Sequence, residues 1–188
     1  MKKPTLRLSV RMLCEGAVLV ALAHCLGYLK LWRMPWGGSV SLIMLPLLFF
    51  ALRWGVSRGL LAGLALGTLQ FLYDGGVVLG WPCIVGDYLL AYTVLGLAGL
   101  FRREKQGGVF LGTLFAGLAR FAVHFVVGAT LWADYMPEVF LGLPMTSPWL
   151  YSLLYNGIYM GLNTLVCFLA FALLRKPLGR YVRGEDLP

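Results

Sequence analysis

Long apolar runs are the feature of this sequence that most restricts its fold. A transmembrane helix needs roughly 20 mostly apolar residues, within a range of about 17 to 25. Only 13% of the 188 residues are charged, about half the usual share of roughly 25%. Candidate spans lie at residues 12–30, 40–54, 59–73, 83–101, 109–131 and 149–174. The sequence therefore predicts an all-α integral membrane protein, a single domain over residues 1–188 with six transmembrane helices.

The N-terminal sequence MKKPTLRLSVR resembles the basic region of a signal peptide, and Ala21-Leu22-Ala23 resembles a cleavage site. The apolar run between Glu15 and this site is too short for the core of a signal peptide. We therefore interpret residues 12–30 as a first transmembrane helix that is retained.

The basic residues are unevenly distributed between the two ends of the six spans. The loops and tails on the side of the termini carry 13 of the 16 Lys and Arg residues, whereas the opposite side carries Lys30 and Arg33. Membrane proteins concentrate Lys and Arg on the cytoplasmic side. The sequence therefore predicts a multi-pass protein of a bacterial cell membrane with both termini in the cytoplasm. Because the charges sit at the ends of apolar segments, the net charge of +8 does not indicate a nucleic-acid partner.

Motifs for enzymatic or metal chemistry are missing from the sequence. The four cysteines have no CxxC spacing and lie in or beside apolar segments, so we expect buried, free thiols. The chain has two histidines and no HExxH, GxSxG or phosphate-loop motif. We therefore expect no catalytic residues, no metal and no cofactor, and any ATP hydrolysis would belong to partner subunits.

One hydrophobic segment, RFAVHFVVGATLW, carries a polar face. Arg120, His124, Gly128 and Trp132 follow one another at four-residue steps and so lie on one side of a helix. Ionisable residues within membrane spans are costly and usually pair or line a functional cavity. Gly128 leaves room for a flat ring between the imidazole and the indole.

Polar residues of two other spans fall at a comparable depth. Asp87 lies near the start of span 83–101, and Tyr151 and Asn156 lie near the start of span 149–174. Together with aromatic faces, this set suits a small, planar, partly cationic ligand that enters from the outer side. The alternative is a buried Asp87–Arg120 ion pair with His124 as an ordinary core residue.

Glycines and aromatic residues support this arrangement. Gly59, Gly63 and Gly67 form a small-residue face that allows close helix packing. The outer segments are long, contain many Gly and Pro residues, and hold every tryptophan except Trp54. These segments suit either an interfacial aromatic belt or a lid over a site.

The residues also resemble a known family over nearly the whole chain. The segments PWGGSVSLIMLPLLFFALRWG, GDYLLAYTVLGLAGLF, RFAVHFVVGATLW and LYSLLYNGIY are similar to those of the thiamine-specific substrate-binding S-component of energy-coupling-factor transporters. The resemblance implies binding of thiamine or a related small molecule from the extracellular side. Uptake would then be driven by a transmembrane coupling protein and two ATPase subunits.

The resemblance also implies roles for individual residues. Trp36 and Trp132 would form aromatic walls, and His124 would stack on or hydrogen-bond to the ligand beside its thiazolium ring. The polar edges of the ligand would be bound by Asp87, Tyr88, Tyr151 and Asn156. The chain departs from the family pattern at two positions, with Asp87 in place of a glutamate and Arg120 in place of a lysine. Ala17 and Ala21 match the small-residue face that docks the coupling protein.

Other functions remain open from the sequence alone. The same fold could bind a thiamine precursor such as hydroxymethylpyrimidine, or riboflavin. A small intramembrane enzyme would use Asp87, Arg120 and His124 as catalytic groups. A structural membrane subunit would need only a buried ion pair.

Overall fold

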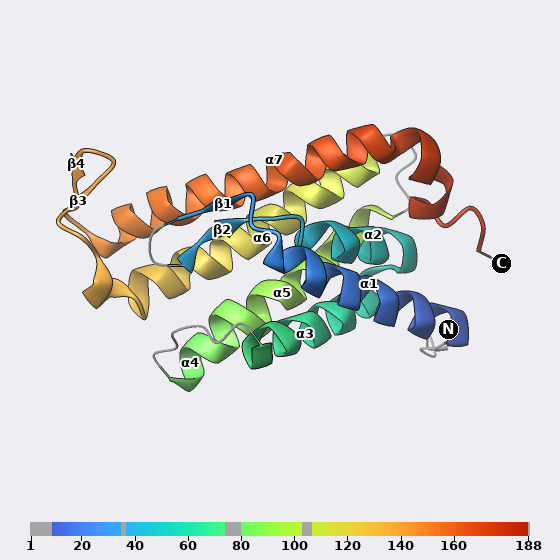
Figure 1. The fold of residues 1–188 in the computed structure, drawn as a ribbon, viewed down its shortest axis with the longest axis horizontal. Helices are drawn as coiled ribbons and strands as arrows, with labels where there is room; N and C mark the ends of the chain where they lie inside the picture. The colour runs from blue at the N-terminus through green and yellow to red at the C-terminus, as the bar shows by residue number, and fades with distance from the viewer. Residues whose placement is uncertain (1–8, 35–36, 74–79, 103–106, 188) are drawn as a thin grey trace, which may run out of the picture.

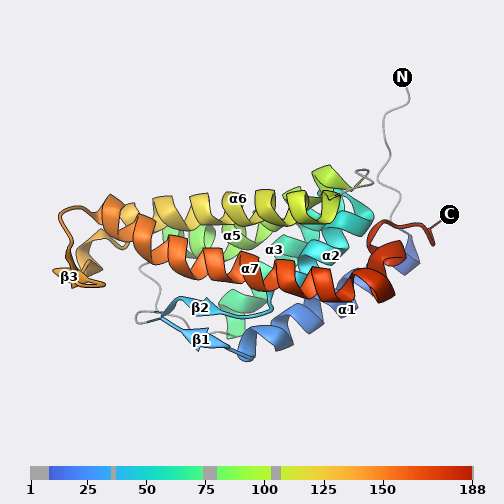
Figure 2. The ribbon, with the colours of Figure 1, turned by 90° about the horizontal axis from the view of Figure 1, so that it is seen from above.

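The computed structural model describes residues 9–34, 37–73, 80–102 and 107–187. Six helical segments form a bundle (Figures 1 and 2). They are α1 (Val10–Tyr28), α2 (Met44–Trp54), α3 (Val56–Tyr73), the segment Trp81–Phe101, α6 (Gly108–Thr130) and α7 (Pro148–Val182). Four of them, α1, Trp81–Phe101, α6 and α7, are long and apolar enough to cross a membrane. The predicted helical fold is thus confirmed, with four such spans among the described residues.

The segment Trp81–Phe101 changes its helical type along its length. It begins with α4 (Trp81–Cys83), continues as a π-helix, η2 (Ile84–Leu90), and passes through α5 (Ala91–Thr93) into a 3₁₀-helix, η3 (Val94–Phe101). The sequence predicted a regular helix over 83–101, and the structure corrects this detail.

Two short hairpins and a 3₁₀ turn complete the described structure. Strands β1 (Trp32–Arg33) and β2 (Ser39–Val40) pair antiparallel, as do β3 (Val139–Phe140) and β4 (Leu143–Pro144). The turn η4 (Ala133–Tyr135) follows α6. The hairpin β1–β2 runs along α7, whereas β3–β4 extends beyond the ends of α6 and α7 (Figures 1 and 2).

The helices of two predicted spans have different limits from the spans. The helix of span 40–54 begins only at Met44, because the Asn163 side chain bonds to the backbone of Ser39 and Ser41 and holds this stretch against α7. Span 149–174 lies within α7, which continues to Val182, a residue buried in the core.

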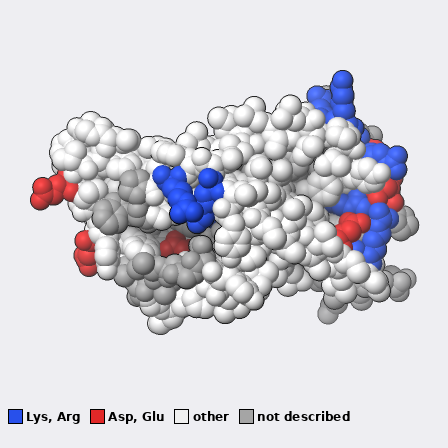
Figure 3. All heavy atoms as spheres, viewed as in Figure 1, with Lys and Arg blue, Asp and Glu red and all other residues white. Residues whose placement is uncertain are grey.

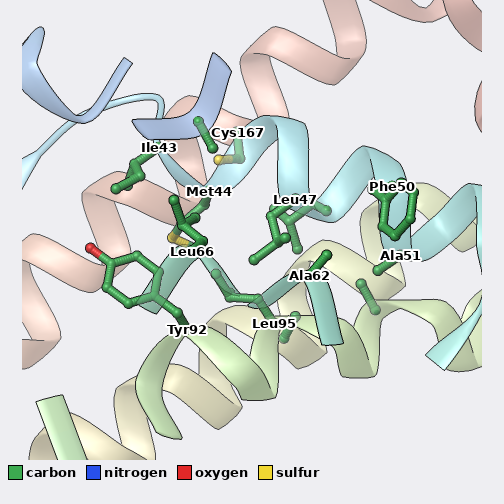
Figure 4. Close-up of a cluster of buried hydrophobic side chains, with 14 of the residues drawn as sticks. Ile43, Met44, Leu47, Phe50, Ala51, Ala62, Leu66, Tyr92, Leu95 and Cys167 are labelled. Atoms are coloured by element: carbon green, nitrogen blue, oxygen red, sulfur yellow. The ribbon is translucent and has the colours of Figure 1, made fainter. Parts of the chain in front are cut away.

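Backbone contact between helices is close where the sequence predicted a small-residue face. A Cβ atom at Gly63 would lie 2.4 Å from the Tyr92 carbonyl oxygen, and one at Gly67 would lie 2.5 Å from that of Tyr88. Gly59 faces Ala51 and Gly96 in the same way. Apolar side chains such as Leu47, Leu66 and Leu95 fill the adjoining core (Figure 4). The glycine face therefore sets the packing of α3 against the segment Trp81–Phe101.

The end of the bundle that holds Val10 and Leu187 is hereafter called the basal end, and the opposite end the distal end. Lys and Arg side chains crowd the basal end (Figure 3). There Arg53 is 2% exposed and donates to Glu15, Asp186 and the Tyr181 carbonyl oxygen. The C-terminal residues after α7 are thus bonded to α1 and α2.

The four cysteines are free. Cys83 and Cys167 are buried as predicted, but Cys14 and Cys25 are exposed on α1. Their predicted burial is wrong because this side of α1 faces away from the bundle. Ala17 and Ala21 are exposed on α1 as well.

Candidate ligand-binding site

A cavity of about 580 Å³ opens within the distal half of the bundle. Its walls come from the end of α1, the β1–β2 hairpin, α3, η2, α5, α6 and α7. Eight residues predicted from the sequence line it: Asp87, Tyr88, Arg120, His124, Gly128, Trp132, Tyr151 and Asn156. The ninth, Trp36, lies outside the described residues. The polar positions of three separate spans therefore meet in one cavity.

The π-helix η2 carries Asp87 and Tyr88. A π-helix is rare and occurs mostly at functional sites, since its wider turn displaces side chains from their α-helical positions. Two glycines allow close packing of η2: a Cβ at Gly86, within η2, would lie 2.5 Å from Val127 Cγ2, and Gly67 of α3 contacts the Tyr88 carbonyl group. Close packing against α6 and α3 thus accompanies the irregular turn that bears the carboxylate.

Two side chains hold Asp87, one from α6 and one from the residues that directly follow α6. His124 Nδ1 donates to Asp87 Oδ1 at 2.9 Å, and Trp132 Nε1 donates to Asp87 Oδ2 at 2.9 Å. Each carboxylate oxygen can accept more than one hydrogen bond. The carboxylate is therefore fixed in place and still has acceptor capacity toward the cavity.

Arg120 does not form the ion pair with Asp87 that the sequence left open. Its Nε donates to His124 Nε2 at 3.4 Å. Its guanidinium carbon lies 4.2 Å from the centroid of the Tyr92 ring, a cation–π contact. The order of contacts is therefore Arg120, His124, Asp87, with the imidazole between the two charged groups.

Asn156 connects α7 to α6. Its Nδ2 donates to the carbonyl oxygens of His124 and Ser152, at 3.2 and 3.0 Å, and to Ser152 Oγ at 2.9 Å. Ser152 Oγ in turn donates to the Phe125 carbonyl oxygen. Among the described residues, no donor reaches Asn156 Oδ1. This oxygen is thus available to accept a hydrogen bond in the cavity.

Gly128 also lies at the contact between α6 and α7. A Cβ atom at this position would lie 2.5 Å from Ser152 Oγ and 2.9 Å from Asn156 Nδ2. The missing side chain therefore allows α7 to approach α6 closely, in addition to leaving the cavity wall flat where the sequence predicted space for a ring.

Three tyrosines of α7 form an aromatic wall. The ring centroids of Tyr151 and Tyr155 are 5.5 Å apart, those of Tyr155 and Tyr159 are 5.8 Å apart, and Tyr159 lies 6.0 Å from the His124 ring. Of the three, only Tyr151 was assigned to the site. The four-residue spacing of these tyrosines was a signal for Tyr155 and Tyr159, whereas nothing in the sequence pointed to Tyr92.

The first loop is bonded to this wall. The Gly38 amide donates to Tyr155 Oη at 2.9 Å. Asn163 Nδ2 donates to the Ser39 carbonyl oxygen at 2.9 Å, and its Oδ1 accepts from the Ser41 amide at 3.0 Å. The residues Gly37, Gly38, Ser39 and Ser41 border the cavity. Asn163 therefore holds strand β2 over the cavity, a role that the sequence analysis missed.

A bundle of apolar helices around a polar, aromatic-lined cavity defines a membrane protein that holds a small molecule. Residues 13–182 match the sequence model of the family described as thiamine transporter protein, and the chain belongs to this family. It is a family of transporters, in agreement with the predicted transport subunit and not with the enzyme alternative.

Relatives and a solved structure agree with this assignment. The chain is 30% identical to the thiamine transporter ThiT of Bacillus subtilis (strain 168), over 92% of this chain and 94% of that protein. It is 29% identical to the thiamine transporter ThiT of Lacticaseibacillus paracasei, over 76% of each chain. The solved structure of ThiT from Listeria monocytogenes has the same fold, with a TM-score of 0.80, 24% identity, and coverage of 92% of this chain and 97% of that one.

Proposed function

We propose that this protein binds thiamine in the distal cavity and delivers it across the membrane. The observation that carries the proposal is the fixed Asp87 carboxylate inside an aromatic-lined cavity, in a chain of the thiamine transporter family. Thiamine combines a flat aminopyrimidine ring with a cationic thiazolium ring. A carboxylate and tyrosine and tryptophan faces attract such a cation.

The polar groups of the cavity suit the edges of the ligand. Asp87 accepts from the exocyclic amine or balances the ring charge, and Asn156 Oδ1 accepts a further hydrogen bond. His124, Trp132 and Tyr151 present ring surfaces, and Trp36 adds a wall from the first loop. Tyr88, Arg120 and Gly128 complete the predicted ligand-binding set.

The distribution of charge supports an orientation in the membrane. The basal end is rich in Lys and Arg (Figure 3), which favours a cytoplasmic position for both termini. The cavity, at the distal end, then opens to the outside of a bacterial cell. In this arrangement residues 1–188 form one multi-pass membrane domain, and thiamine enters from the extracellular side.

The uptake step requires partners in this proposal. The chain acts as the S-component of an energy-coupling-factor transporter, with a transmembrane coupling protein and two ATPase subunits. The exposed pair Ala17 and Ala21 provides a small-residue surface for close helix contact. The double variant A17W/A21W is expected to lose the coupling protein in co-purification and to keep thiamine binding.

Equilibrium titration of the purified protein tests the binding proposal. Thiamine is expected to quench tryptophan fluorescence saturably, and H124A and W132A should each weaken binding. Trp149 is 48% exposed and is not among the described lining residues, so W149F is the matched control and should retain affinity. No response up to high micromolar thiamine, or stronger binding of hydroxymethylpyrimidine or riboflavin, would contradict thiamine as the ligand.

A further inference from the structure

We infer that Arg120 is a positioning residue that holds His124 in the neutral form protonated at Nδ1, and through it fixes the Asp87 carboxylate for the ligand. The inference rests on the contact order Arg120, His124, Asp87, and it deepens the proposed thiamine site. Arg120 therefore acts on the imidazole of His124.

The hydrogen-bond chemistry of the three side chains allows one arrangement. An arginine N–H group can only donate, so His124 Nε2, 3.4 Å from Arg120 Nε, accepts. A neutral imidazole has one N–H group, which then lies on Nδ1 and donates to Asp87 Oδ1 at 2.9 Å. Both ring nitrogens are occupied, and His124 therefore offers a ligand its ring surface.

Packing keeps Arg120 and His124 in place. Arg120 is 7% exposed and His124 is 9% exposed. The Tyr92 ring of α5 covers the guanidinium group at 4.2 Å, and the Tyr159 ring of α7 lies 6.0 Å from the imidazole. The groups that face His124 are thus Asp87 from η2, Arg120 from its own helix, and Tyr159 from α7.

This arrangement also controls the charge next to the ligand. A proton on His124 Nε2 would place two donors, Nε2–H and Arg120 Nε–H, against each other with no acceptor between them. It would also add a cation beside a cationic ligand, where like charges repel. Arg120 therefore keeps the imidazole uncharged while Asp87 remains the group that attracts the ligand.

Nitrogen-15 NMR of the imidazole tests the tautomer directly. The chain has two histidines, so the H24N background leaves His124 as the only imidazole signal. The ligand-free protein is expected to show a protonated Nδ1 and an unprotonated Nε2 between pH 5.5 and 8. A proton on Nε2 at pH 8 in this protein would overturn the inference.

Variants of Arg120 test its effect on the ligand. In R120M, which has no donor for Nε2, thiamine affinity should fall by about tenfold more at pH 5.5 than at pH 8, relative to the unmodified protein. R120K, which keeps a charged donor, should restore the flat pH profile. Q70L removes another buried polar side chain of the cavity that has no contact with His124, and it should change affinity equally at both pH values.

The two proposals fail in different ways. If the unmodified protein does not bind thiamine, the proposed function fails, whereas the tautomer measurement on ligand-free protein still tests the neutral, Nδ1-protonated imidazole that the inference requires. If thiamine binds but R120M shows the same pH profile as Q70L, Arg120 has only a structural role and the inference is overturned. Should R120M not fold, a proton on Nε2 in the H24N protein, or a pH-dependent affinity in R120K, would still overturn the inference.

Discussion

Arg53 and Asp186 lie 133 residues apart in the sequence and are joined by two hydrogen bonds, Nη1 to Oδ1 at 2.5 Å and Nη2 to Oδ2 at 2.8 Å. Arg53 also donates twice to Glu15 and once to the Tyr181 carbonyl oxygen, so its five N–H groups are all used. Trp54 Nε1 and Arg11 donate to Glu15 as well. This basal network ties α1 and α2 to the C-terminal segment.

Removing Arg53 from the basal network should destabilise the fold. R53M removes five hydrogen bonds of a side chain that is 2% exposed, while Arg11 stays bonded to both carboxylates, so the free energy of unfolding should fall by about 1–3 kcal/mol. Thermal unfolding in detergent measures the loss. E185Q is the control, because Glu185 is exposed and forms its ion pair with the exposed Arg183; a melting temperature of R53M equal to that of E185Q would contradict the prediction.

Stability should decrease at acidic pH in a way that depends on Asp186. The hydrogen bond from Arg53 holds the pKa of the Asp186 carboxyl well below its usual value. The unfolded chain therefore takes up this proton first, and the contribution of Asp186 is present above about pH 4 and is lost as the pH falls further. The melting temperature measured from pH 6 to pH 3 should decline less steeply in D186N. Parallel curves for the two proteins would exclude Asp186 as the cause.

The close contact at Gly67 should be sensitive to a single methyl group. In G67A the new Cβ would meet the Tyr88 carbonyl oxygen at 2.5 Å, so η2 must shift, at a cost of about 1–3 kcal/mol. Because Asp87 lies in η2, thiamine affinity should fall along with stability. G161A is the matched control, since nothing lies within 4 Å of a Cβ there; equal effects of the two substitutions would refute the proposed sensitivity.

Loss of the Asn163 amide should free the first loop. N163L removes the bonds to Ser39 and Ser41, and two hydrogen bonds at about 1 kcal/mol each correspond to about a 30-fold change. Thiamine dissociation, followed by stopped-flow tryptophan fluorescence, should accelerate by about this factor. Among the described residues, the neighbouring Thr164 hydroxyl donates to Met160 of its own helix, so T164V should release thiamine at the original rate. An unchanged rate in N163L would show that β2 does not retain the ligand.

The polar face of α6 and the glycine face of α3 could be predicted because both depend on helical spacing within one segment. The π-helix could not, because η2 forms where Gly67 and Gly86 meet neighbouring helices. The basal network was also missed. Arg53 lies at the end of the predicted span 40–54, and its partners Glu15 and Asp186 come from distant parts of the chain.

In the site, too, some features could be predicted from the sequence and others could not. Eight lining residues followed from spacing and from the family resemblance, but their contacts did not. Charge alone suggested an Asp87–Arg120 pair, whereas the structure places His124 between them. Asn163 lies two helical turns from Asn156, and its role depends on β2, a short strand at the start of the predicted span 40–54 that the sequence did not predict.

The length of α7 has a consequence for the cost of the charges at the basal end. Its 35 residues correspond to about 52 Å of helix at 1.5 Å per residue, against about 30 Å of hydrocarbon in a bilayer. In the proposed orientation, the last turns, with Arg175, Lys176 and Arg180, lie in the headgroup layer together with Asp186. Glu15 and Arg53 then meet Asp186 at the water boundary, where charges do not have to enter lipid.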